Sequence, residues 1–145
     1  MSASSETGTA PIADQSPTTK PATHAADENY PLVSVVVATR DRPEMLRTAI
    51  DAITVSDYAG PIETIVVFDQ SEPDETIADD DGHRPVRVIR NTRTPGLAGA
   101  RNSGVRAASG RWLALCDDDD EWFPTKLRRH VRDVGSALQL IAGHV

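Results

Sequence analysis

The chain has 145 residues, which is room for one domain. Its 22 acidic and 15 basic side chains give a net charge of -7, which argues against a general nucleic-acid-binding surface. A single cysteine excludes an internal disulfide framework, and no apolar stretch approaches the roughly 20 residues needed to span a bilayer.

The N-terminal segment 1–29 is rich in Ser, Thr, Ala and Pro and contains almost no large apolar side chains. Such a segment cannot bury enough surface to offset the entropy lost on ordering. We therefore expect a disordered tail at 1–29 and one folded domain at 30–145. The tail lacks the basic and apolar regions of a signal peptide, so we also expect a cytoplasmic location.

The folded part opens with a continuous β-branched run at 32–38, which is typical of a strand covered on both faces. Asp41 and Glu44 then have the spacing of a capping box, and Pro43 suits a first helical turn. An amphipathic helix is predicted to follow, because apolar residues recur at helical spacing: Leu46, Ala49, Ile50 and Ile53.

A second strand is predicted at 62–68, and it ends at Asp69. The loop after it leads towards a short helix, for which Ser71 is a candidate cap. The acidic run at 79–81 has no apolar flanks, so we interpret it as a solvated turn.

A third strand is predicted at 86–89, and a helix of small residues at 98–108. Between residues 84 and 111 the chain has seven arginines and no acid. They form either a solvated basic surface or a cationic wall that meets an anionic ligand such as a diphosphate. The seven are Arg84, Arg87, Arg90, Arg93, Arg101, Arg106 and Arg111.

The most informative stretch is the apolar run 112–116, which stops at four aspartates, Asp117 to Asp120. It predicts a buried strand with Cys116 in the core and carboxylates at the carboxyl end, where open α/β sheets hold ligands. Acidic runs are usually solvated, but apolar residues flank this one on both sides. In an extended backbone, alternate aspartates point to the same side, and such a pair suits Mg²⁺.

Strands and helices alternate along the chain. This order predicts an α/β fold, a Rossmann-like, mostly parallel sheet with flanking helices. Pro124 can open a last helix whose apolar face is formed by Leu127, Val131, Val134, Leu138 and Ile141.

Four segments, in this order, resemble family 2 glycosyltransferases of the GT-A fold. The segments at 33–42 and 65–71 resemble the first two strands of that family with their loops. The segment at 99–104 is similar to its Ala-Arg-Asn-x-Gly helix, and the one at 115–124 to its Asp-x-Asp segment. The resemblance implies a GT-A nucleotide-binding half that binds a nucleotide-diphosphate sugar.

The resemblance also implies roles for single residues. Thr39 and Arg40 would approach the nucleotide, and Asp69 would accept a hydrogen bond from the base. Arg101 would contact phosphate or pack its helix. Asp118 would lie with the nucleotide-binding residues.

For a metal, the resemblance implies that Asp117 and Asp119 bind Mg²⁺ or Mn²⁺, which stabilises charge on the leaving nucleotide. Asp118 and Asp120 have the same spacing, so the register of the pair stays open.

The chain departs from the family at three points. Arg40 stands where an aromatic residue is common, and Phe68 and Gln70 replace Asp and Gly around Asp69. The third departure is length, because the half that carries the general base would lie beyond Val145. We therefore expect no catalytic base in this chain, and a fragment that is complete only with its second half.

Other functions stay open. The chain could be a catalytically incompetent module that binds nucleotide or a partner chain, paired along an open side of its sheet. A sugar-nucleotide nucleotidyltransferase is a third alternative, although no glycine-rich loop follows the first strand. Peripheral membrane association is compatible with the absence of a spanning segment.

Overall fold

The computed structural model describes residues 30–134 and 140–142, so the predicted tail and Leu138 lie outside the described residues. In the described part, no helix is both long and apolar enough to cross a membrane. The elements, in chain order, are β1 Val33–Thr39, α1 Pro43–Thr54, β2 Ile62–Phe68, the 3₁₀ helix η1 Glu75–Ile77, β3 Val86–Arg90, α2 Leu97–Ala107, β4 Trp112–Asp117, α3 Lys126–Val134 and β5 Leu140–Ala142.

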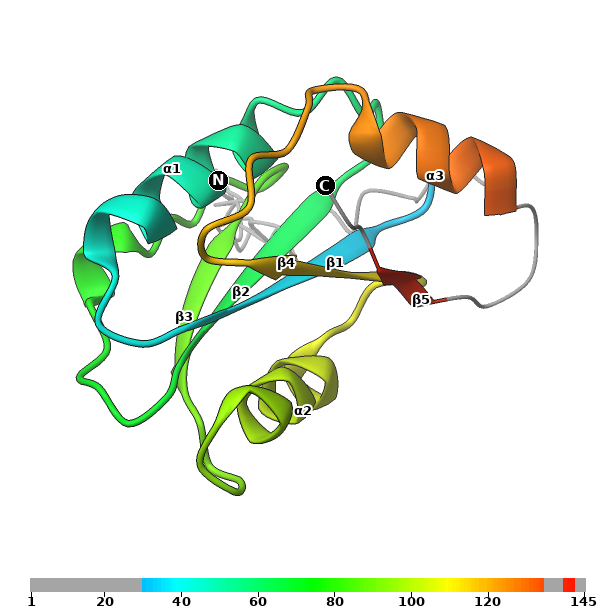
Figure 1. Ribbon diagram of the computed structural model, residues 1–145. Coiled ribbons are helices and arrows are strands. Elements are labelled where there is room, and N and C mark those ends of the chain that lie inside the picture. The colour runs from blue at the N-terminus through cyan, green and yellow to red at the C-terminus, as the bar shows by residue number, and fades with distance from the viewer. Residues whose placement is uncertain (1–29, 135–139, 143–145) are drawn as a thin grey trace, which may run out of the picture.

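The strands form one parallel sheet in the order β3-β2-β1-β4-β5. At its centre Val36 of β1 pairs with Ile65 of β2 and Leu115 of β4. Helices α1 and α3 lie on one face and α2 on the other (Figure 1). The predicted Rossmann-like α/β fold with flanking helices is thereby confirmed.

Burial explains why β1 and β2 are almost continuously apolar. All seven residues of each strand are buried, because helices cover both faces of the sheet. On one face, α2 packs very closely: a Cβ added at Gly104 would lie 2.3 Å from Cγ1 of Val36. The small residues of α2 therefore serve close helix–sheet packing.

Two predicted helix caps are wrong. The N-cap of α1 is Arg42, which makes no side-chain cap hydrogen bond, and Asp41 lies one residue too early with φ 54°. In η1, the cap is Asp74, whose carboxylate accepts a hydrogen bond from the Thr76 backbone at 3.0 Å. The hydroxyl of Ser71 instead donates to the backbone oxygen of Asp69 at 3.4 Å.

The last predicted helix is correct only in its first half. Leu127 is buried, and Val131 and Val134 pack against the same core, but α3 ends at Val134. Ile141 lies in β5 and pairs with Ala114 of β4, so its placement in the helix was wrong. Apolar spacing alone could not show this, because β5 is fixed by hydrogen bonds to the edge of a distant strand.

At the amino ends of the strands, several elements meet at the buried carboxylate of Glu63. Its Oε1 accepts hydrogen bonds from the Ser34 hydroxyl at 2.5 Å and from the Ser109 backbone and hydroxyl at 2.6 and 2.8 Å. Arg87 lies 3.7 Å from Oε2. Burial raises the pKa of Glu63, but these hydrogen bonds outweigh it, and the net pKa is lowered. Glu63 thus joins β1, β2, β3 and the start of β4.

Candidate nucleotide site

A pocket of about 450 Å³ lies at the carboxyl ends of β1, β2 and β4, beside the start of α2. The chain adds β2 and β3 on one side of β1, and β4 and β5 on the other, so the strand order reverses here. Such a crevice is where open α/β sheets bind ligands. It is lined by Ala38, Thr39, Arg40, Arg42, Asp69, Gly96, Leu97, Ala100, Asp117, Asp118 and Asp119.

The aspartate run forms a turn and not an extended strand. β4 ends at Asp117, and the backbone N–H of Asp120 donates to the Asp117 carbonyl at 3.0 Å. Because the chain reverses, the predicted alternation of side chains holds for Asp117 to Asp119 but is wrong for Asp120. Carboxylate oxygens of Asp117, Asp119 and Asp120 instead lie within 4.8 Å of one another. We call these three residues the acidic cluster.

Asp118 lies apart from this cluster and is buried. One of its oxygens accepts a hydrogen bond from the Thr39 hydroxyl at 2.8 Å, and the other from Arg42 at 3.3 Å. Asp118 and Thr39 therefore tie the end of β1 to the end of β4. Both line the pocket, but their direct contact with a nucleotide stays a prediction.

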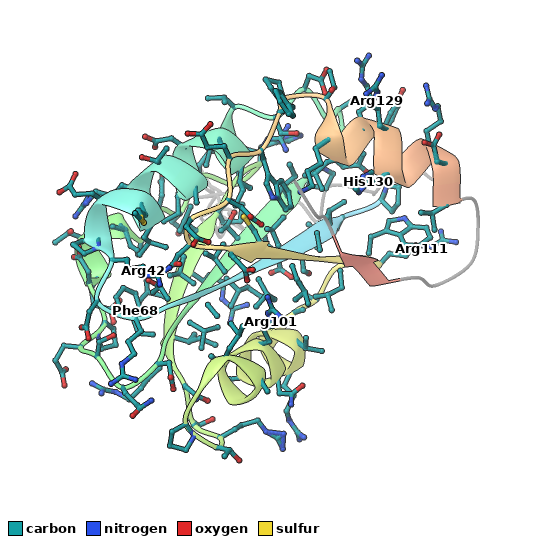
Figure 2. The ribbon with its side chains drawn as sticks, in the orientation of Figure 1. Arg42, Phe68, Arg101, Arg111, Arg129 and His130 are labelled. Carbon is teal, nitrogen blue, oxygen red and sulfur yellow. The ribbon has the colours of Figure 1, made fainter. Side chains whose placement is uncertain are left out.

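Two arginines meet the acidic cluster from elements on opposite faces of the sheet (Figure 2). Arg101 of α2 pairs with Asp117 at 2.5 Å, and Arg42, just before α1, pairs with Asp119 at 3.2 Å. They balance part of the negative charge. Carboxylate oxygens are the ligands that Mg²⁺ and Mn²⁺ prefer, so the closely spaced cluster fits a divalent cation.

Of the two alternatives for the arginines at 84–111, the cationic wall does not form. Among its seven arginines, only Arg101 contacts the aspartate run. Arg84 donates to the Tyr58 carbonyl, Arg90 pairs with Glu72, and Arg111 lies at the other end of β4 (Figure 2). The other cations at the pocket, Arg40 and Arg42, come from the first loop.

Asp69 lines the pocket and is buried, with 6% of its surface exposed. Its Oδ1 accepts a hydrogen bond from the Asn91 amide at 2.8 Å. Its Oδ2 accepts from the Gln70 amide at 3.0 Å and the Gly96 backbone at 2.9 Å. The bonds from Asn91, Gln70 and Gly96 and the nearby Arg40 charge lower the pKa of Asp69, so it is a carboxylate at neutral pH.

Gln70 adopts the backbone conformation that glycine favours in this turn. Its φ is 54°, which is left-handed. The replacement of glycine therefore leaves a left-handed residue after Asp69, and it adds an amide beside the Asp69 carboxylate. The other replacement, Phe68, is buried in the core.

Asn91 was not predicted as a site residue. Besides bonding Asp69, its side chain accepts a hydrogen bond from the Ser103 hydroxyl at 2.8 Å and donates to the Thr94 carbonyl at 3.0 Å. It thus connects β2, α2 and the loop between β3 and α2. Its signal was its position at the start of the loop after the predicted third strand, and it directly follows β3 as the structure has it. Sequence reasoning also missed Arg42, Gly96, Leu97 and Ala100.

The predicted site residues thus lie together. Thr39, Arg40, Asp69 and three of the aspartates line one pocket, and Arg101 reaches it through Asp117. Cys116 is buried beneath them, and burial raises the pKa of its thiol to about 12. It is therefore a core residue, as predicted, and not a nucleophile.

Several proteins are similar to parts of this chain. The succinoglycan biosynthesis protein ExoO of Rhizobium meliloti (strain 1021) is 46% identical over 57 residues, which are 39% of this chain and 16% of that protein. The Escherichia coli protein WfgD, named UDP-Glc:alpha-D-GlcNAc-diphosphoundecaprenol beta-1,3-glucosyltransferase, is 28% identical over 100 residues, 69% of this chain and 40% of that protein.

A solved structure has a similar fold. The mannosyltransferase PcManGT from Pyrobaculum calidifontis, in complex with GDP-Man and Mn²⁺, matches with a TM-score of 0.63 and 27% identity, over 81% of this chain and 36% of that one. The chain thus spans less than half the length of each of these proteins. The family model described as glycosyl transferase family 2 matches residues 34–143. The chain therefore belongs to glycosyl transferase family 2.

Proposed function

We propose that this chain is the donor-binding half of a glycosyltransferase, which binds a nucleotide-diphosphate sugar for transfer to an acceptor. One observation carries the proposal: a single pocket contains both a buried hydrogen-bond acceptor, Asp69, and an acidic cluster paired with arginines. The first suits a base, and the second suits a diphosphate with its cation. The enzymatic relatives named above support glycosyl transfer over nucleotidyl transfer.

Asp117 and Asp119, with Asp120 beside them, would hold Mg²⁺ or Mn²⁺. The ion would neutralise charge that develops on the leaving diphosphate. Mn²⁺ is present in the PcManGT complex, which supports this choice. Arg42 and Arg101 pair with cluster carboxylates and add positive charge at the pocket, where the phosphates would bind.

We assign no general base to this chain. The described pocket carboxylates are engaged: Asp69 and Asp118 accept protein hydrogen bonds, and the acidic cluster is assigned to the cation. A general base is typically worth about 10²–10⁴-fold in rate. We therefore expect nucleotide binding by the 145-residue chain without efficient transfer.

For the whole protein, we propose an acceptor of the kind that the name of WfgD states, a sugar on a diphospholipid. Such an acceptor would require peripheral contact with the membrane, and nucleotide sugars as donors would place the reaction in the cytoplasm.

The test is a calorimetric titration of the 145-residue chain with UDP and GDP, with and without Mn²⁺. We expect at least one nucleotide to bind, and Mn²⁺ to tighten it by about tenfold or more. Asp117→Asn together with Asp119→Asn should abolish that gain. Asp80→Asn, in the exposed acidic turn, is the matched control and should keep it.

Two outcomes would contradict parts of the proposal. An unchanged Mn²⁺ dependence in the double variant would show that the acidic cluster does not hold the ion. Sugar transfer at enzymatic rates by the purified 145-residue chain would show that it contains a general base after all.

A further inference from the structure

We infer that α3 and the turn before it form a docking surface for an anionic lipid membrane, which exposed arginines and an exposed phenylalanine would contact. The inference rests on the proposed function, because an acceptor on a diphospholipid lies in a membrane, and it assigns the part of the chain that would meet that membrane. Among the described residues, those that line the nucleotide pocket include none from α3, so the two surfaces are separate.

Helix α3 has an apolar side that faces the core, with Leu127 buried and Val131 packed beside it. Its other side is basic and exposed, and Arg129 points away from the sheet (Figure 2). Three arginines share this side, because the last of them follows the other two by four and three residues. We call Arg128, Arg129 and Arg132 the α3 arginines.

The positive charge of the α3 arginines is only partly balanced. Arg128 pairs with Asp57 at 3.1 Å, and Arg132 pairs with its neighbour Asp133 at 2.9 Å. Arg129 has no acidic partner within the part of the chain that the structure describes. Like charges at this spacing on a helix repel one another. In a chain with a net charge of -7, such a local excess of positive charge points to an anionic partner.

A hollow of about 600 Å³ lies between the α3 arginines and two tyrosines. Tyr58 is buried, and its hydroxyl donates to the Pro31 carbonyl at 2.6 Å. Tyr30 is exposed and lies edge-on to Tyr58, with the ring centroids 6.0 Å apart. An exposed tyrosine suits the boundary between water and an apolar phase, and guanidinium groups bind phosphate oxygens. The hollow therefore suits the phosphate of a lipid head group.

Exposed apolar side chains adjoin this basic surface. Phe123, in the turn before α3, is 78% exposed, and Val55, at the end of α1, is also exposed. The two turns touch, because the Asp57 backbone N–H donates to the Pro124 carbonyl at 3.0 Å. Basic residues bind anionic head groups, and apolar residues beside them enter the membrane interface. Duplex nucleic acid would contact the arginines but leave both apolar side chains in water, so the observations favour a membrane.

The test is co-sedimentation of the full 145-residue chain with lipid vesicles. Vesicles that contain phosphatidylglycerol should bind the chain about tenfold or more tightly than vesicles of phosphatidylcholine alone. Added salt should weaken this binding, because salt screens exposed charges. The chain should bind without nucleotide or Mn²⁺, since the hollow and the nucleotide pocket are formed by different residues.

Matched variants would locate the surface. Arg129→Glu should weaken binding to the phosphatidylglycerol vesicles about tenfold or more. Arg106→Glu makes the same change of charge at an exposed position of α2, on the opposite face of the sheet (Figure 1), and should have little effect. Phe123→Ser should weaken binding a few-fold, whereas Val105→Ser, at an exposed position of α2, should not.

The inference is overturned if both kinds of vesicle bind the chain equally, or if Arg129→Glu binds as tightly as the unchanged chain. It is also overturned if duplex DNA binds as tightly as the anionic vesicles and equally depends on Arg129. Titration of the same proteins with UDP and GDP separates this inference from the proposed function. Nucleotide binding without vesicle binding overturns the docking surface alone, and vesicle binding without nucleotide binding overturns the proposed function alone.

Discussion

Strand β2 carries a buried carboxylate near each end, Glu63 close to its start and Asp69 directly after its last residue. Hydrogen bonds lower the pKa of both carboxyl groups. The donors to Glu63 come from β1 and from the turn before β4, and those to Asp69 from loops after β2 and β3. The two residues thus look alike in burial and charge state.

Their difference lies in what each carboxylate has left to bind. Glu63 takes three hydrogen bonds on one oxygen, lies near Arg87 with the other, and is not among the residues that line the pocket. Asp69 lines the pocket and keeps one acceptor position. A low pKa and burial therefore do not identify a binding residue. Asp69 is the proposed binding residue of the two because it lines the pocket.

The largest expected effect comes from Glu63→Ala. It leaves the Ser34 hydroxyl and the Ser109 backbone N–H without their acceptor at the amino edge. We expect a loss of about 2–4 kcal/mol in the free energy of unfolding. Nucleotide affinity of the folded protein should stay unchanged. Urea denaturation and calorimetry would measure the two quantities.

The control for this variant is Glu72→Ala. Glu72 pairs with Arg90 at 2.7 Å, but its side chain is 88% exposed. Exposed ion pairs contribute about 0–1 kcal/mol, so little stability should be lost. If Glu63→Ala also weakened nucleotide binding, the two ends of β2 would not be separable in function.

The contribution of Glu63 to stability should depend on pH. Because the pKa of Glu63 is below its ordinary value of 4.5 in the folded protein, the unfolded chain takes up its proton first as the pH falls. The stability that Glu63 contributes is complete above that value and is lost as the pH falls through the folded pKa.

This loss can be isolated with Glu63→Gln, which carries no titrating group at this position. The difference in unfolding free energy between the wild type and this variant should be constant near neutral pH and change in the acid range. Urea denaturation at a series of pH values from 7 to 3 would measure it, starting from the ordinary pKa of 4.5. A difference that is independent of pH would contradict the lowered pKa.

Arg42→Ala, at the carboxyl ends of the strands, is expected to have a smaller effect on stability. The Arg42 side chain is 53% exposed, so its pairs with Asp118 and Asp119 should contribute no more than about 1 kcal/mol. Removing a positive charge beside the acidic cluster should tighten Mn²⁺ alone by a few-fold. Calorimetry with MnCl₂ would measure it. Weaker binding would mean that Arg42 orders the cluster more than it competes with the ion.

The smallest effect is expected from Asp80→Asn, in the second acidic run. Its three aspartates are exposed, and the Asp79 and Asp81 carboxylates accept hydrogen bonds from backbone groups in their own turn. Stability should change by less than about 0.5 kcal/mol. Mn²⁺ affinity should not change, whereas Asp119→Asn should lower it. A large effect at Asp80 would show that acidic composition alone determines cation binding.

The sequence by itself determined strands β1 to β4 and the position of the candidate site along the chain. Strands β1 and β2 are continuous apolar runs because both of their faces are buried, so local composition reports them directly. Asp69 and Asp117 follow or end such runs, and in a parallel sheet these ends meet at one edge. That inference needs only the order of elements, which is local information.

Only the tertiary structure decided which side chains contact one another at the carboxyl ends of the strands. The turn at Asp117 to Asp120 depends on hydrogen bonds within the folded loop, and it separates Asp118 from the acidic cluster. Asn91 reaches Asp69 across 22 positions of sequence, because β3 lies beside β2. Arg42 and Arg101 meet the cluster while other arginines point elsewhere. These contacts join residues that are far apart in the sequence. They depend on which strands become neighbours in the sheet, and sequence spacing does not give that information.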